Sequence, residues 1–363
     1  MELWIPGPVP VSDAVRAAYS VEPPSHLAEG FKADFARALR AMRTVWKAGP
    51  SYQPFVVAGT GTLAMEATAV NLVEPGDRVL VVNVGLFGDR MATMLTRRGA
   101  RVFQVGTAPG ADLDLAEVER ALDEHAPSVL FATHVDTSTG ARVDARALCR
   151  LAKARGVLTA FDGVCATGAE RMEQEDWGAD VVFTASQKAI GLPAGLALWG
   201  CSPAALAKRA SLSSPPPLVL DWQSWLPIMT AYEAEQNSYF GTPPTTLIPA
   251  LAVALDDLVD EGIDAVFARH ARVATDVQRQ LVDAGLELVA QTPAHTLSAL
   301  YLPDGIDGPT ALGQLRERGF VLAGGLHPLL KSTTFRLGHM GTAIRDPQRV
   351  QRVVDAVIEV MRG

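Results

Sequence analysis

The sequence predicts an α/β protein with a large, mostly parallel seven-stranded sheet and a smaller α+β part towards the C-terminal end. Two observations lead to this fold class. Short runs rich in Val, Leu and Phe alternate with longer segments of helical periodicity, which is the pattern of parallel α/β units. These runs are apolar almost throughout instead of alternating with polar residues, which is typical of strands covered on both faces.

Seven segments are the candidate strands of the large sheet: 54–58, 78–83, 101–105, 128–133, 157–162, 180–185 and 195–200. The segment between the last two is too short for a helical crossover, so we expect one antiparallel strand at that edge of the sheet. The Pro-rich residues that follow, 211–225, predict a loop.

The C-terminal third predicts a second unit. It contains helical patterns at 246–263, 264–284 and 345–361 and candidate strands at 286–290, 296–302 and 334–338. We expect three parts: an N-terminal segment, 1–20, that packs on the small domain, a large domain, 21–258, and a small domain, 259–363.

Composition narrows the range of functions. With 363 residues, 48% hydrophobic and 20% charged, the chain can bury a large core. A formal net charge of −8 argues against nucleic acid or an anionic membrane as the main partner. No stretch reaches the roughly 20 apolar residues of a membrane span, and the N-terminus lacks the pattern of a secretory signal. The three cysteines, Cys149, Cys165 and Cys201, have no metal-ligand spacing, so we expect no metal and a reducing, cytoplasmic location.

Lys188 and Asp162 each follow a candidate strand, and ligands of parallel sheets bind at the carboxyl ends of strands. An amine and a carboxylate that face one ring are what pyridoxal phosphate requires, the amine for a Schiff base and the carboxylate for the pyridine nitrogen. Taken alone, Lys188 could be a solvated surface cation and Asp162 a helix cap or a structural ion-pair partner.

A turn between a strand and a helix predicts a phosphate site. Thr60, Gly61 and Thr62 follow the strand 54–58 and precede an apolar helical pattern, so backbone N–H groups and hydroxyls would face an anion at the helix N-terminus. GTGTLA lacks the third glycine of a dinucleotide fingerprint, which favours a single phosphate. A capped connection without a ligand is the alternative.

Three further side chains lie at strand ends or on a strand. Phe87, between Gly85 and Gly88, could present an aromatic face or be a core residue. Ser138 lies in a polar cluster that could donate to a cofactor or form an ordinary turn. Arg336, flanked by apolar residues, needs a partner, either a substrate carboxylate or an internal acid.

In this order, the segments resemble those of the class V, fold-type I, pyridoxal phosphate-dependent aminotransferases. The likeness is greatest to the alanine–glyoxylate and serine–glyoxylate (serine–pyruvate) aminotransferase group. It covers nearly the whole chain, through PGPVPV, AGTGTLAMEA, NVGLFG, THVDTSTG, FDGVCATG, SQKA, YFGTPPTT and RLGHMG.

The resemblance implies a role for each matching position. Lys188 would be the catalytic Schiff-base lysine and Asp162 the catalytic partner of the pyridine nitrogen. The other cofactor contacts would be Phe87 stacked on the ring, Val164 beneath it, Ser138 near the phenolic oxygen, and Thr60, Gly61, Thr62 and Gln187 at the phosphate. Thr62 stands where relatives often have His. Tyr239 and Thr242 would reach the phosphate of the other subunit of a homodimer, and Arg336 would bind the substrate carboxylate.

The implied activity is transfer of an amino group from alanine or serine to an oxo acid such as glyoxylate or pyruvate, through an imine on Lys188. A 2-aminoethylphosphonate–pyruvate-type enzyme, another class V aminotransferase, and a binding or regulatory module without turnover are alternatives. Cysteine desulfurases share the fold but use a C-terminal thiol, and no cysteine here lies beyond Cys201.

Overall fold

Seven strands form the central sheet of the computed structural model, which describes residues 1–362. They are β2 (Gln53–Gly59), β3 (Arg78–Asn83), β4 (Arg101–Gly106), β5 (Val129–Thr133), β6 (Leu158–Asp162), β7 (Val181–Ala185) and β8 (Gly195–Cys201). Their order in space is β2-β8-β7-β6-β5-β3-β4. The predicted mostly parallel sheet is therefore confirmed, and each strand begins and ends within one residue of its predicted bounds.

One strand runs against the others, as predicted, but it is not at the edge. β8 pairs antiparallel with both β7 and β2, so β2 forms the edge and runs parallel to β7. The carboxyl end of β2 consequently lies at the same side of the sheet as the ends of β6 and β7. This topology brings the turn after residue 59 next to the segments that follow Asp162 and Ala185.

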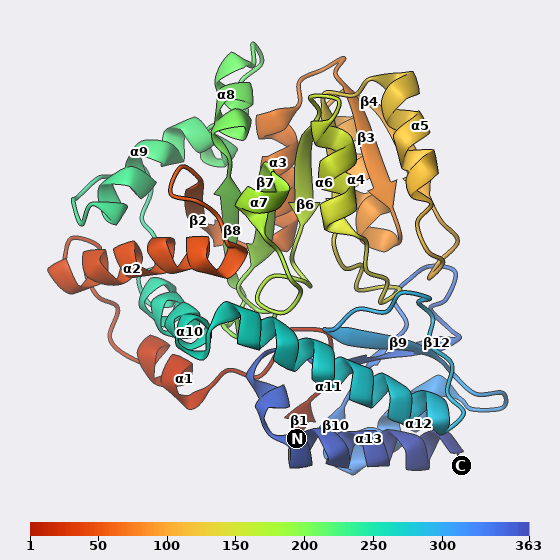
Figure 1. Cartoon of the computed structure of the whole chain (residues 1–363). Helices are drawn as coiled ribbons and strands as arrows, with labels where there is room; N and C mark the ends of the chain where they lie inside the picture. Colours follow the sequence, from red (N-terminus) through yellow and green to blue (C-terminus); the bar gives the residue numbers. More distant parts are fainter. Residues whose placement is uncertain (363) are drawn as a thin grey trace.

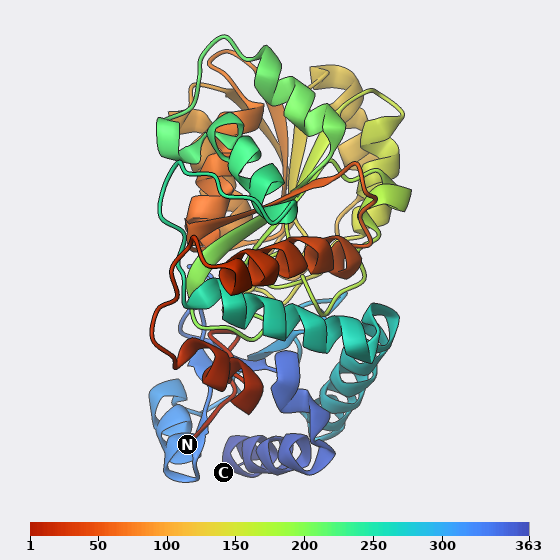
Figure 2. The ribbon, with the colours of Figure 1, turned by 90° about the vertical axis from the view of Figure 1, so that its left-hand side faces the viewer.

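Helices cover both faces of this sheet, as Figure 2 shows when the molecule is viewed along its side. They are α2 (Glu29–Trp46), α3 (Gly61–Leu72), α4 (Leu86–Arg97), α5 (Leu115–His125), α6 (Ala145–Lys153), α7 (Gln174–Trp177), α8 (Pro203–Ser211), α9 (Trp222–Glu233) and α10 (Leu247–Glu261). Their apolar faces and the sheet form one large core, because strands such as β5 and β7 are buried along their whole length. Among residues 1–362, none of the helices combines the length and apolar character that a membrane crossing requires.

The C-terminal residues form a second, smaller core below the large sheet in Figure 1. A three-stranded sheet has the order β11 (Ala323–Gly324), β12 (Thr334–Gly338), β9 (Leu297–Tyr301). The helices here are α11 (Ile263–Asp283), α12 (Gly308–Glu317), α13 (Pro347–Arg362) and the 3₁₀ turn η2 (Gly341–Arg345). The predicted division into domains at residue 258 stays a prediction.

The first residues join this second core. β1 (Glu2–Leu3) pairs parallel with β10 (Phe320–Val321), and Trp4 is fully buried there. The chain then passes beneath the large sheet into the short helix α1 (Asp13–Tyr19) (Figure 1). The N-terminal segment therefore spans the distance from the small core to the edge of the large one.

Two predictions of local structure were wrong. Residues 286–290 form no strand: only Leu288 makes an isolated bridge to Leu300, and Gln291 N–H then donates to Gly110 O at 2.9 Å, which turns the segment towards the large sheet. Residues 211–225 are not all loop, because a 3₁₀ turn, η1 (Leu218–Leu220), leads into α9.

A buried ion pair holds the start of α9. Asp221 caps the helix by accepting from Gln223 N–H, and both its oxygens accept from Arg209 of α8, at 2.8 and 2.6 Å. Both side chains are almost fully buried. Neither interaction is visible in the Pro-rich sequence, which explains why it resembles a loop.

Replacing Asp221 with alanine should lower the free energy of unfolding by about 3–5 kcal/mol, because the Arg209 charge would stay buried without its partner. Urea denaturation monitored by circular dichroism measures the change. Asp276→Ala, which removes one acid from an exposed pair with Arg279, is the control and should cause a much smaller loss. Equal losses in the two variants would contradict the assigned role of the buried pair.

Candidate active site

Asp162 and Lys188 border the same cavity. Asp162 is the last residue of β6, and Lys188 lies in the turn between β7 and β8. The cavity has a volume of about 170 Å³ at the carboxyl ends of the parallel strands. Its walls include these predicted site residues: Thr60, Gly61, Thr62, Phe87, Asp162, Val164, Gln187 and Lys188.

The sequence analysis assigned no site role to the other residues that line this cavity. They are Met65, Arg90, Thr133, Val135, Thr137 and Cys165. Arg90 is the most informative of them, because its guanidinium lies 4.7 Å from the centre of the Phe87 ring and donates to Thr62 Oγ1 at 3.3 Å. The spacing from Phe87 to Arg90, one turn along α4, is the only sequence signal for this contact.

The carboxylate of Asp162 is buried and accepts one backbone hydrogen bond, from Val164 N–H at 2.9 Å. Burial raises the pKa of Asp162 to about 7, and the neighbouring Asp136 carboxylate adds to the rise. The positive charges of Lys188 and Arg90 oppose it only partly. A positively charged N–H group bound in the cavity would therefore satisfy Asp162 better than the protein alone does.

Asp136 organises the turn beside this cavity. It accepts hydrogen bonds from Phe87 N–H at 2.9 Å and from Ser138 N–H at 2.8 Å. Gly85 leaves room for this carboxylate, since a Cβ there would lie 2.5 Å from it. The backbone that carries Phe87 is thereby fixed to the loop after β5.

Ser138 faces this turn and is not among the residues lining the cavity. Its hydroxyl donates to Asp136 and accepts from Leu86 N–H at 3.1 Å. The neighbouring Thr137 does line the cavity, with its hydroxyl 2.7 Å from Cys165 Sγ. A predicted contact with a cofactor through Ser138 stays a prediction, and Thr137 is the hydroxyl that the sequence reasoning missed.

The structure provides features that fit a phosphate. α3 begins at Gly61, and no side chain caps its first turn. A Cβ on Gly61 would lie 2.9 Å from Val164 Cγ2, so only glycine fits where the helix approaches the cavity. Gln187 lines the same cavity, and the N–H groups of its side-chain amide can donate to an anion there. Free backbone N–H groups and a side-chain amide at one place suit an anion.

The N-terminal segment lies against Lys188. The lysine Nζ donates to Pro6 O, and Val9 N–H donates to Gln187 O at 3.1 Å. A Cβ on Gly7 would lie 2.5 Å from Lys188 Cδ. Residues 6–9 thus pack against Lys188. Sequence patterns do not predict this contact, because the two segments lie about 180 residues apart in the chain.

Arg336 reaches the cavity wall from the small core. Its guanidinium donates to Gly324 O at 2.9 Å and to Thr137 O at 3.3 Å. Burial lowers the pKa of Arg336, and no carboxylate of residues 1–362 lies within 4.0 Å of it. The predicted alternative of an internal salt bridge is therefore absent from the described part of the chain, and the guanidinium has donors left for a ligand.

Tyr239 and Thr242 do not border this cavity. The side chain of Tyr239 is 67% exposed, with its ring 5.9 Å from that of His26. Thr242 lines a different, apolar cavity beside Trp225 and Phe240. A single chain does not bring these two residues to Lys188, so their predicted role across a dimer interface stays a prediction.

Known proteins share these features over nearly the whole chain. The model of the family described as aminotransferase class-V matches residues 14–334. An alanine–glyoxylate aminotransferase from Saccharomyces cerevisiae is 37% identical, over 93% of this chain and 91% of the relative. An L-aspartate–glyoxylate aminotransferase from Paracoccus denitrificans is 32% identical, over 94% and 86%.

Solved structures agree with the sequence relatives. The alanine–glyoxylate aminotransferase from Nostoc sp. superposes with a TM-score of 0.91 at 32% identity, covering 99% of this chain and 95% of that one. The pyridoxamine–pyruvate aminotransferase from Mesorhizobium loti, at 24% identity and a TM-score of 0.92, has the same fold. The predicted fold-type I architecture is confirmed. The chain belongs to the class V aminotransferase family and is a transaminase.

Proposed function

We propose that this protein binds pyridoxal 5′-phosphate and transfers the amino group of a small amino acid, alanine or serine, to an oxo acid such as glyoxylate or pyruvate. The observation that carries the proposal is the convergence of Lys188 and Asp162 on one cavity. The names of relatives that use alanine, serine or aspartate with glyoxylate support the choice of substrates.

The cofactor fits the side chains of this cavity. The amine of Lys188 would attach it, and Asp162 would accept from its ring nitrogen. Phe87 and Val164 would lie on its two faces, with Ser138 or Thr137 near its phenolic oxygen. The start of α3, with Thr60, Gly61, Thr62 and Gln187, would hold its phosphate. When bound, this cofactor supplies an electron sink that makes a Cα proton removable.

The protein's own groups account for the remaining chemistry. Lys188 Nζ would be the amine that takes and returns the substrate proton, since it is the primary amine that borders the cavity. Asp162 stabilises positive charge at the far end of the cavity. Arg336 binds the substrate carboxylate and orients the Cα–H bond, because its free donors lie beside Thr137.

A homodimer forms part of the proposal. Tyr239 is exposed in one chain although it is a large aromatic residue, and Leu218 and Val219, just before α9, are exposed as well. If a second copy covered these residues, Tyr239 and Thr242 of one chain would lie near the phosphate site of the other chain. The three cysteines are all free and buried, which supports a reducing, cytoplasmic location.

Lys188→Ala should abolish transamination, with a loss of at least about 10³-fold, because no other amine would remain to hold the cofactor or move the proton. The rate of oxo-acid formation from alanine and glyoxylate measures this. Lys208→Ala, which removes a lysine far from the cavity on α8, should keep normal activity. Comparable turnover in the Lys188 variant and the wild type would refute the assignment.

Asp162→Asn should reduce kcat and yet stabilise the cofactor-free protein at pH 8. Burial raises the pKa of Asp162 from its ordinary value of 3.8 to about 7, so the folded protein holds a proton that the unfolded chain releases. Stability is therefore lost as pH rises from about 4 to 7, and the asparagine removes this loss of a few kcal/mol. Urea unfolding at pH 4 and pH 8 tests it. A variant that is less stable than the wild type at pH 8 would contradict the buried-charge explanation.

Arg336→Ala should raise the KM for both amino acid and oxo acid by about 10- to 100-fold, the loss expected for charge-assisted hydrogen bonds to a carboxylate. Steady-state kinetics with each substrate varied in turn measures the effect. Arg318→Ala, which removes an arginine from the surface near α13, is the matched control. An unchanged KM in the Arg336 variant would rule out carboxylate binding by this residue.

A further inference from the structure

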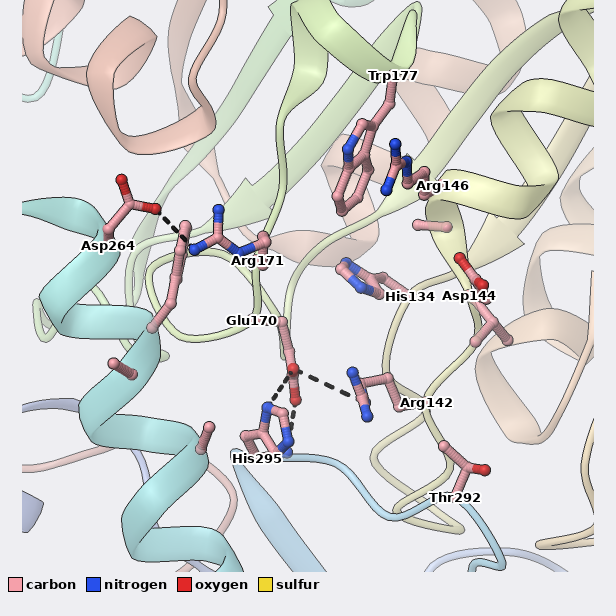
Figure 3. Close-up of a pocket in the computed structure, with 15 residues that line it drawn as sticks. His134, Arg142, Asp144, Arg146, Glu170, Arg171, Trp177, Asp264, Thr292 and His295 are labelled. Carbon is pink, nitrogen blue, oxygen red and sulfur yellow. Dashed lines mark hydrogen bonds and ion pairs between the residues drawn. The ribbon is translucent and has the colours of Figure 1, made fainter.

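A second cavity, of about 590 Å³, lies outside the active site (Figure 3). One side is formed by the start of α6 and by α7, and the other by α11 and residues 292–295. Its lining includes none of the residues that line the cavity at Lys188. The two cavities do share a wall, because His134 faces this one while its neighbours Thr133 and Val135 face the other.

His134 points into this cavity in Figure 3 and lacks a partner. The residue is only 4% exposed, and its ring, which makes no side-chain hydrogen bond within residues 1–362, is open to the cavity. Burial lowers the pKa of His134 to about 4, so the ring is neutral at pH 7 and has one N–H donor and one acceptor. A buried polar group of this kind is stabilised when a ligand or water bonds to it.

The acids around the cavity already have partners. Glu170 is buried and accepts from His295 Nδ1 at 2.8 Å. Asp264 pairs with Arg171 at 2.8 Å and with Lys47 at 3.1 Å. Asp144 caps α6 by accepting from Ala147 N–H at 2.9 Å. Glu170 and Asp264 therefore offer little to a cationic ligand, whereas Asp144 is exposed and bonds only to a neutral N–H group.

Two arginines have donors to spare. Arg142 Nε is buried and lies 3.8 Å from Glu170 Oε2, too far for a hydrogen bond, and it has no other partner among residues 1–362. Arg146, at the first turn of α6, is exposed and makes no ion pair within the same part of the chain. Arg142 thus keeps N–H donors beyond its ion pair with Glu170, and Arg146 keeps all of its own, so both can bind an anionic group next to the start of α6.

The remaining wall is apolar and partly aromatic. Trp177 from α7 and Phe267 from α11 line it together with Ala268 and Ala271. Figure 3 shows Trp177 on the same side as Arg146, above the His134 ring. Flat apolar surfaces next to positive charge suit a planar molecule that carries an anionic group.

We propose that this cavity binds a small planar organic carboxylate that also carries a hydroxyl or carbonyl group. The carboxylate would pair with Arg146 and Arg142, the planar part would pack on Trp177 and Phe267, and the hydroxyl or carbonyl would bond to His134. The site is independent of the transamination chemistry, since neither Lys188 nor Arg336 contributes to it.

Titration calorimetry of the cofactor-loaded protein with 4-hydroxybenzoate tests the proposal. We expect a saturable site whose Kd rises at least about tenfold in Arg146→Gln, the loss expected for one charge-assisted hydrogen bond. Arg146 is exposed, so this variant should fold normally. Arg97→Gln removes an equal charge from the exposed end of α4, outside both cavities, and should leave Kd unchanged.

Two further measurements separate this site from the active site. Arg336→Ala should leave the binding in place, because a carboxylate bound at the active site would depend on that residue. The uncharged 4-hydroxybenzyl alcohol should bind at least about tenfold more weakly. The proposal is overturned by the absence of saturable binding, by its loss in Arg336→Ala, or by equal affinities in the Arg146 and Arg97 variants.

Discussion

The active site depends on a single buried carboxylate, that of Asp162, at the end of β6. Its one hydrogen bond, from Val164 N–H, does not offset its burial, and its pKa rises to about 7. A group in this state costs stability until a positive partner binds. The surrounding residues supply the means to hold such a partner, with Lys188 on the same cavity, an uncapped helix start at Gly61 and an aromatic face at Phe87.

Residues 133–137, at and after the end of β5, line the cavity beside Asp162 and also contact other parts of the molecule. Thr133, Val135 and Thr137 line the active-site cavity, while His134 faces the second cavity, as expected for a chain whose side chains alternate in direction. Asp136 holds the turn that carries Phe87, and Thr137 O accepts from Arg336 on β12. Movement of the C-terminal core relative to the sheet would therefore change the position of Arg336 at the site.

Sequence patterns predicted what depends on local order. The seven strands were located within one residue because continuous apolar runs end at polar strand termini, and the same termini identified Asp162 and Lys188. Contacts between distant segments were missed: Pro6 on Lys188, Thr137 beside Cys165, and the Arg209–Asp221 pair that begins α9. The strand expected at 286–290 is reduced to one bridge beside β9, because the next residue, Gln291, donates its N–H to Gly110 O and leaves the small sheet.

A crystal structure of the protein grown with pyridoxal 5′-phosphate would test the central claim most directly. The account predicts continuous density from Lys188 Nζ to the cofactor, with a carboxylate oxygen of Asp162 about 2.7–3.2 Å from the ring nitrogen. Cofactor bound elsewhere, or a ring nitrogen that faces away from Asp162, would contradict it.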